Sequence, residues 1–234
     1  MTPHQIVSHS EWLEARKHLQ AKEKAFTRAR DALSQERREL PWERVEKNYV
    51  FEGPAGRETL AQLFAGKSQL VVYHFMFDPE WQAGCKSCSF WADNFNGIDV
   101  HLAHRDTALL AVSRAPYAKL AAYKQRMGWS FKWVSSYGSD FNFDYGVSFT
   151  PEQVAKGEIL YNYGNFKAFG AELPGISVFA KDEGNAIFHT YSCYSRGVDM
   201  LNGAYHYLDL TPKGRDEPEQ AKQAWLRRHD EYAE

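Results

Sequence analysis

The sequence predicts an α/β domain with a central mixed sheet flanked by helices, and three observations support this prediction. Gln69 to Phe77 (QLVVYHFMF) is a nearly continuous apolar run, as in a strand that is buried on both faces. A second apolar run, Ala108 to Ser113, follows a stretch with helical spacing. Gly175 to Ala180 is a third such run, and the turn Asp182 to Asn185 after it indicates an antiparallel hairpin.

Helices are expected between and after the first two strands. Cys88 to Leu102 has apolar residues at helical spacing, and Pro116 opens a helix that runs to Met127. Strand, helix, strand and helix in this order imply parallel strands with right-handed crossovers. FKWVSS and FDYGVSF are expected to form short strands, and Thr150 to begin another helix.

Residues 1–48 are expected to form an N-terminal helical extension. Ser8 and Glu11 match a capping box, Pro41 ends the pattern, and an apolar residue recurs at every seventh position between them. The recurring residues are Trp12, Leu19, Phe26, Leu33 and Leu40. We expect this stripe to pack on the chain's own core, and a homodimer is the alternative.

The other expected divisions are a main domain over residues 49–212 and a C-terminal helical tail over residues 213–234. In the tail, a polar helix is expected after Pro218.

Composition indicates a globular protein and argues against some partners. The chain has 234 residues, 44% hydrophobic and 25% charged, which suffices for a core without disulfides. A formal net charge of −2 gives no reason to expect nucleic acid or an anionic membrane as a partner. Since neither a signal peptide nor a membrane span is recognisable, the cytoplasm is the expected location.

Two of the three cysteines form a C-x-x-C pair, Cys85 and Cys88, between a buried strand and a helix. This spacing allows both sulfurs to lie at one helical turn, where the helix N-terminus lowers a thiol pKa below about 8.5. We expect Cys85 to be the attacking thiol and Cys88 to resolve the mixed disulfide. Cys193 is expected to be a small buried apolar residue, with a further resolving thiol as the alternative.

Because the carboxyl ends of parallel strands meet at one edge of a sheet, further polar side chains are expected beside the dithiol. They are Asp78, Arg114, Ser135 and Ser136. Asp78 is either a proton acceptor for the resolving thiol or a turn residue. Arg114 either binds a substrate anion, stabilises a thiolate or forms a structural ion pair.

A zinc site is a weaker alternative for the pair, because zinc takes four ligands and the histidines form no second paired motif. The histidines considered are His74, His101, His104, His189 and His206. His74 lies in a buried strand and is expected to be a hydrogen-bonded core residue. We therefore expect neither a metal nor a cofactor.

Several segments resemble the bacterial domain-of-unknown-function family 899. They are YHFMFDPEW, GCKSCSFWADNF, VSRAP, RMGWSFKWVSS, SDFNFDYGVSF, LPGISVF, HTYS and YHYLDLTPKGRDE. The resemblance extends from about Leu19 to Glu217. It implies a thioredoxin-like fold, a predicted dithiol-disulfide oxidoreductase with Cys85 and Cys88 as its pair, and Pro174 as the thioredoxin-type proline.

From this position of Pro174 we expect a cis peptide bond after Leu173, with the proline ring against the Cys85 sulfur. The Leu173 backbone would then be free to pair with an extended substrate. Trp81, Arg114 and Leu173 are the expected substrate-binding residues.

The sequence also departs from thioredoxins. Gly84 stands where they have tryptophan, Lys86 and Ser87 replace Gly-Pro, and a long insertion precedes Pro174. The peroxiredoxin pattern Pro-x-x-x-Thr/Ser-x-x-Cys is missing as well.

The favoured function is thiol-disulfide exchange with a protein or small-molecule disulfide or oxidant, followed by regeneration by an unknown reductant. The alternatives are a non-catalytic thioredoxin-fold protein that binds a ligand or a protein, and a peroxiredoxin-like thiol peroxidase.

Overall fold

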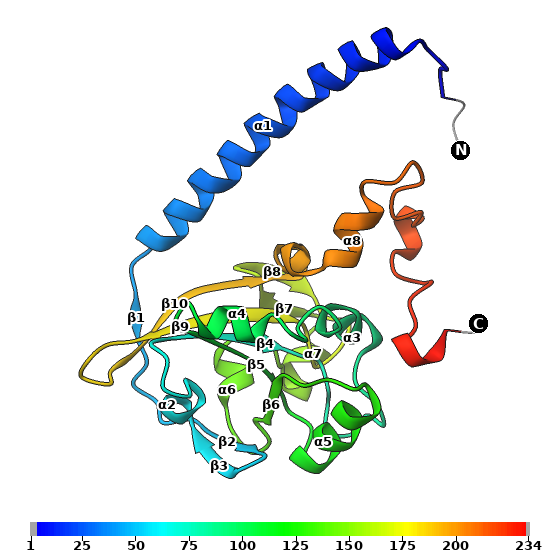
Figure 1. Cartoon of the computed structure of the whole chain (residues 1–234). Helices are drawn as coiled ribbons and strands as arrows, with labels where there is room; N and C mark the ends of the chain where they lie inside the picture. The colour runs from blue at the N-terminus through cyan, green and yellow to red at the C-terminus, as the bar shows by residue number, and fades with distance from the viewer. Residues whose placement is uncertain (1–3, 233–234) are drawn as a thin grey trace. The chain divides into compact units, whose positions relative to one another are not determined.

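The computed structural model describes residues 4–232, which fall into two units, one ending at Pro41 and the other beginning at Trp42 (Figure 1). The first unit consists mainly of helix α1 (His9–Glu39). Its capping box is present: the Ser8 N–H donates to Glu11 Oε2 at 2.9 Å, and the Glu11 N–H donates to Ser8 Oγ at 3.3 Å. Helix α1 has no buried side chain, and the residues of its apolar stripe are 44–69% exposed. Packing of the stripe on the core stays a prediction.

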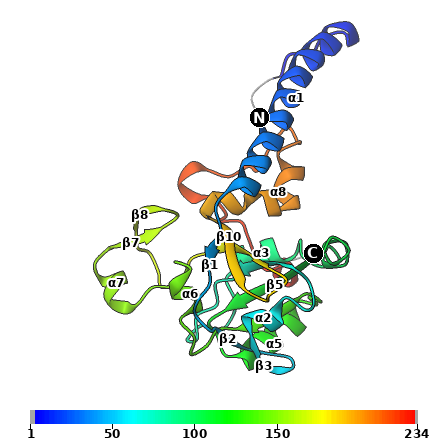
Figure 2. The same cartoon turned by 90° about the vertical axis from the view of Figure 1, so that its left-hand side faces the viewer.

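The second unit is built on an eight-stranded sheet with the spatial order β1-β10-β9-β4-β5-β6-β2-β3 (Figures 1 and 2). The strands are β1 (Glu43–Arg44), β2 (Val50–Gly53), β3 (Gly56–Thr59), β4 (Gln69–His74), β5 (Thr107–Ser113), β6 (Lys132–Ser135), β9 (Gly175–Lys181) and β10 (Ile187–Tyr194). A separate hairpin pairs β7 (Glu158–Tyr161) with β8 (Gly164–Lys167).

The predicted mixed sheet is confirmed. Strand β4 is parallel to β5 and antiparallel to β9, so that Tyr73 lies between Ala111 and Ile176. Strand β6 extends the parallel part beside β5, and β10 returns antiparallel to β9. A β-α-β unit followed by an antiparallel hairpin against its first strand is the thioredoxin-like arrangement that the sequence predicted.

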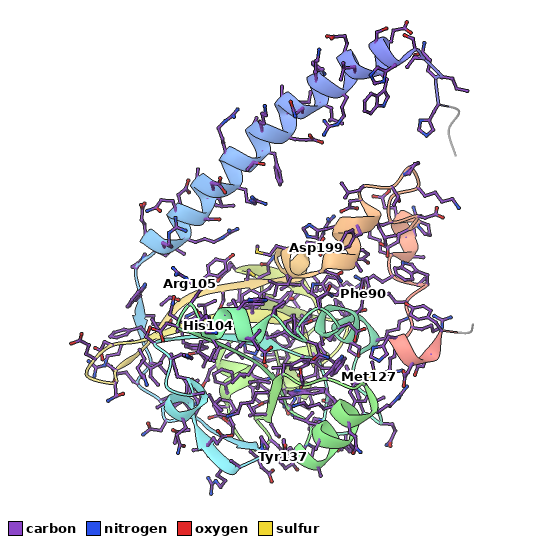
Figure 3. All side chains as sticks on the ribbon, in the orientation of Figure 1. Phe90, His104, Arg105, Met127, Tyr137 and Asp199 are labelled. Carbon is purple, nitrogen blue, oxygen red and sulfur yellow. The ribbon has the colours of Figure 1, made fainter. Side chains whose placement is uncertain are left out.

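Helices cover both faces of this sheet. The helices of this unit are α2 (Leu60–Leu63), α3 (Lys86–Ala92), α4 (Asp99–Ala103), α5 (Tyr117–Arg126), α6 (Phe141–Asp144), α7 (Pro151–Ala155) and α8 (Gly203–Leu208). Of these, α7 lies beside the β7–β8 hairpin and not on a face of the sheet (Figure 2). Because side chains alternate along a strand, Tyr73 of β4 packs in one core cluster with α3 and α5, while Val72 packs in another with α2 and α6. Side chains, many of them aromatic, fill the space between the layers (Figure 3).

The helix predicted from Cys88 to Leu102 is wrong in its extent. The segment forms α3 and α4 with a turn between them, and Gly97 in that turn has a φ of 83°. This left-handed backbone suits glycine and interrupts the helical hydrogen bonds.

FDYGVSF does not form the expected strand. Its first residues belong to α6, and only Ser148 makes an isolated bridge, with Glu172. Of its aromatic side chains, Phe149 is buried, whereas Phe143 of α6 and Tyr145 are partly exposed. The helix start at Thr150 is confirmed, because its side chain caps α7.

The C-terminal residues up to Tyr232 do not form the expected helix. They contain two short 3-10 helices, at Glu219–Ala221 and His229–Glu231; a third, at Ser195–Leu201, lies earlier in the chain. Side-chain hydrogen bonds, and not those of a long helix, fix this segment. Glu217 Oε1 accepts from Tyr205 Oη at 2.8 Å and from Trp225 Nε1 at 2.7 Å. The last two residues of the predicted tail lie outside the described range.

Within residues 4–232, no helix combines the length and apolar character that crossing a membrane requires.

Candidate functional site

The dithiol lies where the loop after β4 meets α3. Cys85 is the residue immediately before the helix, and its N–H donates to the Met76 carbonyl at 3.1 Å. Its side chain is partly exposed, whereas Cys88, in the first turn of α3, is buried. Neither cysteine is in a disulfide. Both thiols therefore lie at the start of one helix, as expected.

Close packing positions the residue that precedes Cys85. A Cβ atom on Gly84 would lie 2.7 Å from the Phe75 ring and 3.1 Å from the Tyr123 ring. Since real Cβ atoms do not approach other atoms so closely, only glycine fits here. This explains why the sequence departs from the thioredoxin tryptophan at Gly84.

The two thiols have opposite electrostatic environments. A hydrogen bond from the Cys88 thiol lowers the pKa of Cys85 to about 6, and the N–H groups of Cys88 and Ser87 add to this effect against burial. Burial raises the pKa of Cys88, and its hydrogen bond to Cys85 adds to that rise. Near neutral pH, Cys85 is thus the thiolate and Cys88 the thiol.

Cys88 has two further polar neighbours. The Met76 N–H points at its sulfur at 3.4 Å, and the buried Tyr73 hydroxyl hydrogen-bonds with it. Both contacts lower the pKa of Cys88 and partly offset the effect of burial. Tyr73 has this position because it points from β4 toward α3.

An apolar pocket of about 220 Å³ opens beside Cys88. Its lining comes from β4, α3, the β7–β8 region, the segment before β9, and two later segments. The lining residues are Tyr73, Met76, Ser87, Cys88, Trp91, Tyr161, Phe166, Phe169, Leu173, Pro174, Ser195, Arg196, Asp199 and Gln223. The sequence did not predict the β7–β8 hairpin that supplies part of this wall.

Pro174 shares this pocket with Cys88, and Cys85 is not among its lining residues. The predicted cis peptide is wrong, since none of the peptide bonds in the described part of the chain is cis. The Leu173 N–H already bonds to the Val147 carbonyl at 2.8 Å, so the chain reaches β9 extended and needs no sharp turn. The Leu173 N–H is therefore not free for a substrate backbone, and pairing through the Leu173 carbonyl stays a prediction. The Pro174 carbonyl accepts from Tyr161 Oη at 2.6 Å.

Arg114 forms a partly buried ion pair at the predicted sheet edge. Its Nη1 lies 2.6 Å from Glu172 Oε1 and 3.9 Å from Asp78 Oδ2, and its guanidinium stacks over the Phe143 ring. Glu172 also accepts from Ser148 Oγ at 2.8 Å, and burial raises its pKa to about 7 against the effect of Arg114. This geometry is that of a structural ion pair, one of the three roles expected for Arg114. The sequence did not indicate Glu172 as its partner.

The remaining predicted residues at this edge have structural contacts. Asp78 Oδ1 accepts from the Glu80 N–H at 2.9 Å, which supports the turn hypothesis. The Trp81 carbonyl accepts from Lys119 Nζ at 3.1 Å, and Trp81 does not line the pocket. Ser135 and Ser136 donate to backbone carbonyls at the end of β5.

The other cysteine and histidine of interest are core residues. His74 is buried, its Nε2 lies 2.8 Å from Ser177 Oγ, and burial lowers its pKa to about 3. Cys193 is buried, outside any disulfide, and its thiol donates to the Gly197 carbonyl at 3.5 Å. Among residues 4–232, no three His, Cys, Asp or Glu side chains come together as a metal site would require.

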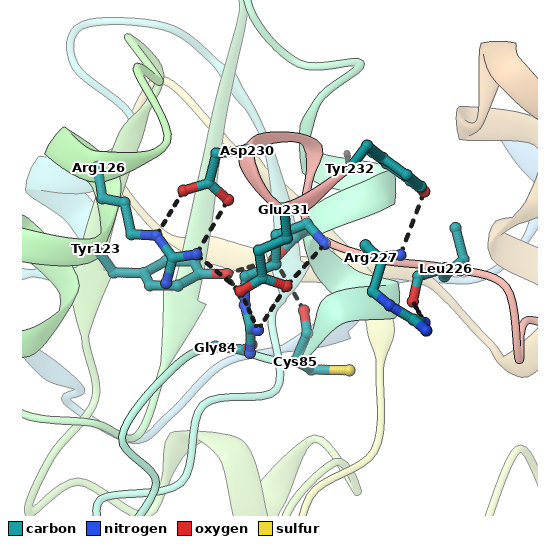
Figure 4. Close-up of polar contacts among 11 residues, drawn as sticks. Gly84, Cys85, Tyr123, Arg126, Leu226, Arg227, Asp230, Glu231 and Tyr232 are labelled. Atoms are coloured by element: carbon teal, nitrogen blue, oxygen red, sulfur yellow. Dashed lines mark hydrogen bonds and ion pairs between the residues drawn. The ribbon is translucent and has the colours of Figure 1, made fainter. Parts of the chain in front are cut away.

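A contact that the sequence did not reveal joins the C-terminal segment, residues 224–232, to the residue before Cys85 (Figure 4). Arg228 Nη2 donates to the Gly84 carbonyl at 2.8 Å, and its Nε donates to Tyr123 Oη at 2.7 Å. Asp230 pairs with Arg126 at 2.6 Å, which ties the same segment to α5. No local pattern around Arg228 indicates this contact.

The fold and the paired thiols define a thioredoxin-fold protein with a C-x-x-C dithiol. The chain belongs to the family described as "Bacterial protein of unknown function (DUF899)", whose model matches residues 1–232. This confirms the resemblance found in the sequence. No curated protein matches the chain.

Among solved structures, the chain is similar to peroxiredoxins. A cysteine-to-serine variant of PrxQ from Xylella fastidiosa is 12% identical with a TM-score of 0.45, over 71% of this chain and 95% of that one. Peroxidoxin BcpB from Mycobacterium tuberculosis is 13% identical with a TM-score of 0.43, over 69% and 93%. Peroxiredoxin Q from Xanthomonas campestris is 15% identical with a TM-score of 0.42, over 66% and 87%. At this level of similarity, nothing about the reaction of this chain follows.

Proposed function

We propose that this chain is a thiol-disulfide oxidoreductase in which Cys85 attacks and Cys88 resolves. The observation that carries the proposal is the opposite protonation of two neighbouring thiols: the pKa of Cys85 is lowered to about 6, and that of Cys88 is raised. A thiolate is the nucleophile of disulfide exchange, and Cys85 is the more exposed thiol.

In the first step, the Cys85 thiolate attacks one sulfur of a substrate disulfide. A Cys85–substrate disulfide forms, the substrate S–S bond breaks, and the other half leaves as a thiolate. Once formed, the mixed disulfide carries no charge on Cys85, so the electrostatic cost of deprotonating Cys88 falls.

In the second step, Cys88 loses its proton to solvent and attacks the Cys85 sulfur. The second half of the substrate leaves as a thiolate, and the enzyme keeps a Cys85–Cys88 disulfide. Two electrons have passed from the dithiol to the substrate. A cellular thiol reductant, expected in the cytoplasm, would return them.

The test is the rate of iodoacetamide alkylation between pH 4 and 10, with mass spectrometry to assign the modified residue. The intact protein should react at Cys85 with a midpoint near its pKa of about 6, below the ordinary value of about 8.5. Cys85→Ser should remove this reaction and reduce disulfide turnover more than about a thousandfold. Cys88→Ser should accumulate a mixed disulfide with the substrate.

Cys193→Ser is the matched control, because this cysteine is buried and its thiol donates to the Gly197 carbonyl at 3.5 Å. It should leave the pH midpoint unchanged. A midpoint above pH 8, or turnover that survives Cys85→Ser, would contradict the proposal and favour a binding protein.

A further inference from the structure

We infer that the pocket beside Cys88 binds a bulky apolar or aromatic group carried by the disulfide substrate, and that the β7–β8 hairpin recognises it. This inference rests on the proposed function, because it names the substrate class of the same dithiol. The expected substrate is an uncharged organic disulfide with such a group next to its sulfur.

The hairpin is fixed against the pocket. Tyr161 of β7 is buried, its hydroxyl donates to the Pro174 carbonyl at 2.6 Å, and it accepts from the Ser195 N–H at 2.9 Å. The turn between the strands is tight, since both Asn162 and Tyr163 have positive φ values, of 53° and 63°. The aromatic wall thus has a defined position beside the dithiol.

Aromatic rings continue from this anchor toward solvent. The ring centroids of Phe166 and Tyr161 are 5.3 Å apart, and those of Phe169 and Phe166 are 5.6 Å apart. Phe169 is 71% exposed although it lines the pocket. A ligand that covers this ring removes apolar surface from water, so the pocket favours an apolar ligand.

Other residues that line the pocket are apolar as well. Trp91 is buried and its only ring N–H donates to the Val198 carbonyl at 2.9 Å, so its ring meets the pocket as apolar surface. Leu173 and Pro174 add aliphatic surface on the side of β9. An aromatic group in this pocket would therefore meet rings and aliphatic carbons.

The charges at the pocket rim balance one another. Arg196 Nη2 lies 3.1 Å from Asp199 Oδ2, and Arg215 Nη1 lies 3.2 Å from the same oxygen. Arg215 also pairs with Asp209 at 2.9 Å. Because each arginine has a carboxylate partner, the rim does not single out an anionic ligand, and we expect an uncharged one.

The test follows oxidation of the reduced protein by two uncharged disulfides, 4,4′-dithiodipyridine and 2-hydroxyethyl disulfide. The first is aromatic and the second is small and polar. The rate constant of a variant is compared with that of the unsubstituted protein for the same probe, because the two disulfides differ in intrinsic reactivity. Phe169→Ser should slow the aromatic probe about tenfold and change the polar probe less than about twofold.

Leu160→Ser is the matched control, since Leu160 lies on β7 of the hairpin that precedes Phe169, is 70% exposed and does not line the pocket. It should leave both rates unchanged. Circular dichroism checks the fold of each variant. As a second measurement that needs no substitution, benzyl alcohol should inhibit oxidation by the aromatic probe and spare the polar one.

Equal effects of Phe169→Ser on both probes, or equal inhibition of both by benzyl alcohol, would overturn the inference and leave the proposed function standing. If neither disulfide oxidises Cys85 in the unsubstituted protein, the proposed function itself fails, and the inference fails with it.

Discussion

The two sides of the dithiol differ in the chemistry that holds them. On the Cys85 side, the C-terminal segment is attached through charged and polar contacts, with Arg228 bonded to the Gly84 carbonyl. On the Cys88 side, the β7–β8 hairpin contributes aromatic rings to an apolar pocket. Polar contacts of defined direction fix a backbone position, whereas an apolar wall tolerates groups of several shapes. The comparison thus separates positioning of the thiolate from recognition of the substrate.

The largest effect is expected from Gly84→Ala, which tests how tightly the Cys85 side is packed. The added methyl group would overlap the rings of Phe75 and Tyr123, so the free energy of unfolding should fall by about 3 kcal/mol. Urea denaturation measures this change. Gly170→Ala is the control, because a Cβ there meets no atom within 4 Å. If the two variants are equally stable, the Cys85 side is looser than its contacts indicate.

The second largest effect is expected in the pH dependence of the free energy of unfolding, through Glu172. This residue anchors the segment leading to Leu173 and Pro174 on the Cys88 side. Its pKa is raised from 4.5 to about 7, so the folded protein binds this proton more tightly than the unfolded chain does. The resulting stabilisation is complete below pH 4.5 and is lost as the pH rises through 7. Between pH 5 and 7, the contribution should fall by roughly 2 kcal/mol.

Glu172→Gln removes this titration and keeps an oxygen for Ser148 and Arg114. The difference in unfolding free energy between the unsubstituted protein and the variant should therefore change with pH, as followed by urea denaturation at several pH values. Parallel profiles for the two proteins would contradict the raised pKa.

The smallest effect is expected from Arg228→Ala, which separates the two sides of the dithiol. Loss of the hydrogen bonds to Gly84 and Tyr123 should lower the free energy of unfolding by about 1 kcal/mol and speed hydrogen exchange in residues 224–232. The ratio of the oxidation rate constants for the aromatic and the polar probe should stay as in the unsubstituted protein. Arg227→Ala is the control, since that side chain bonds within its own segment, to the carbonyls of Ala224 and Leu226. Equal effects of both variants would argue against a specific role for Arg228.

The sequence was sufficient where local pattern determines structure. The apolar run of β4, the capping residues Ser8 and Thr150, and the turn before β10 each depend on neighbours a few residues away. The position of Cys85 before α3 followed from the same kind of pattern, because a buried strand and a helical spacing flank it.

The parts that were missed depend on contacts between distant residues or on unusual backbone conformations. Neither central residue of the β7–β8 turn is a glycine, and a tyrosine at positive φ is uncommon, so Asn162 and Tyr163 gave little sign of a hairpin. The hydrogen bond from Leu173 to Val147 and the contact of Arg228 with Gly84 exist only in the folded chain. Glu172 was overlooked because its partner Arg114 lies far from it in sequence.

The position of the β7–β8 hairpin within the chain has a consequence for how this fold can vary. The hairpin lies in the connection between β6 and β9, two strands whose places in the sheet are fixed by their own neighbours. Closing a flexible loop costs entropy that grows only with the logarithm of its length, about 0.6 kcal/mol for each doubling. Because Phe141 and Val147 of the same connection are buried, the place where residues can be inserted at little cost is the exposed turn of the hairpin, where Tyr163 is 76% exposed. Such insertions change the hairpin that forms part of the pocket wall and leave the sheet as it is. The thiols and the scaffold can stay constant while ligand preference diverges among proteins that share them.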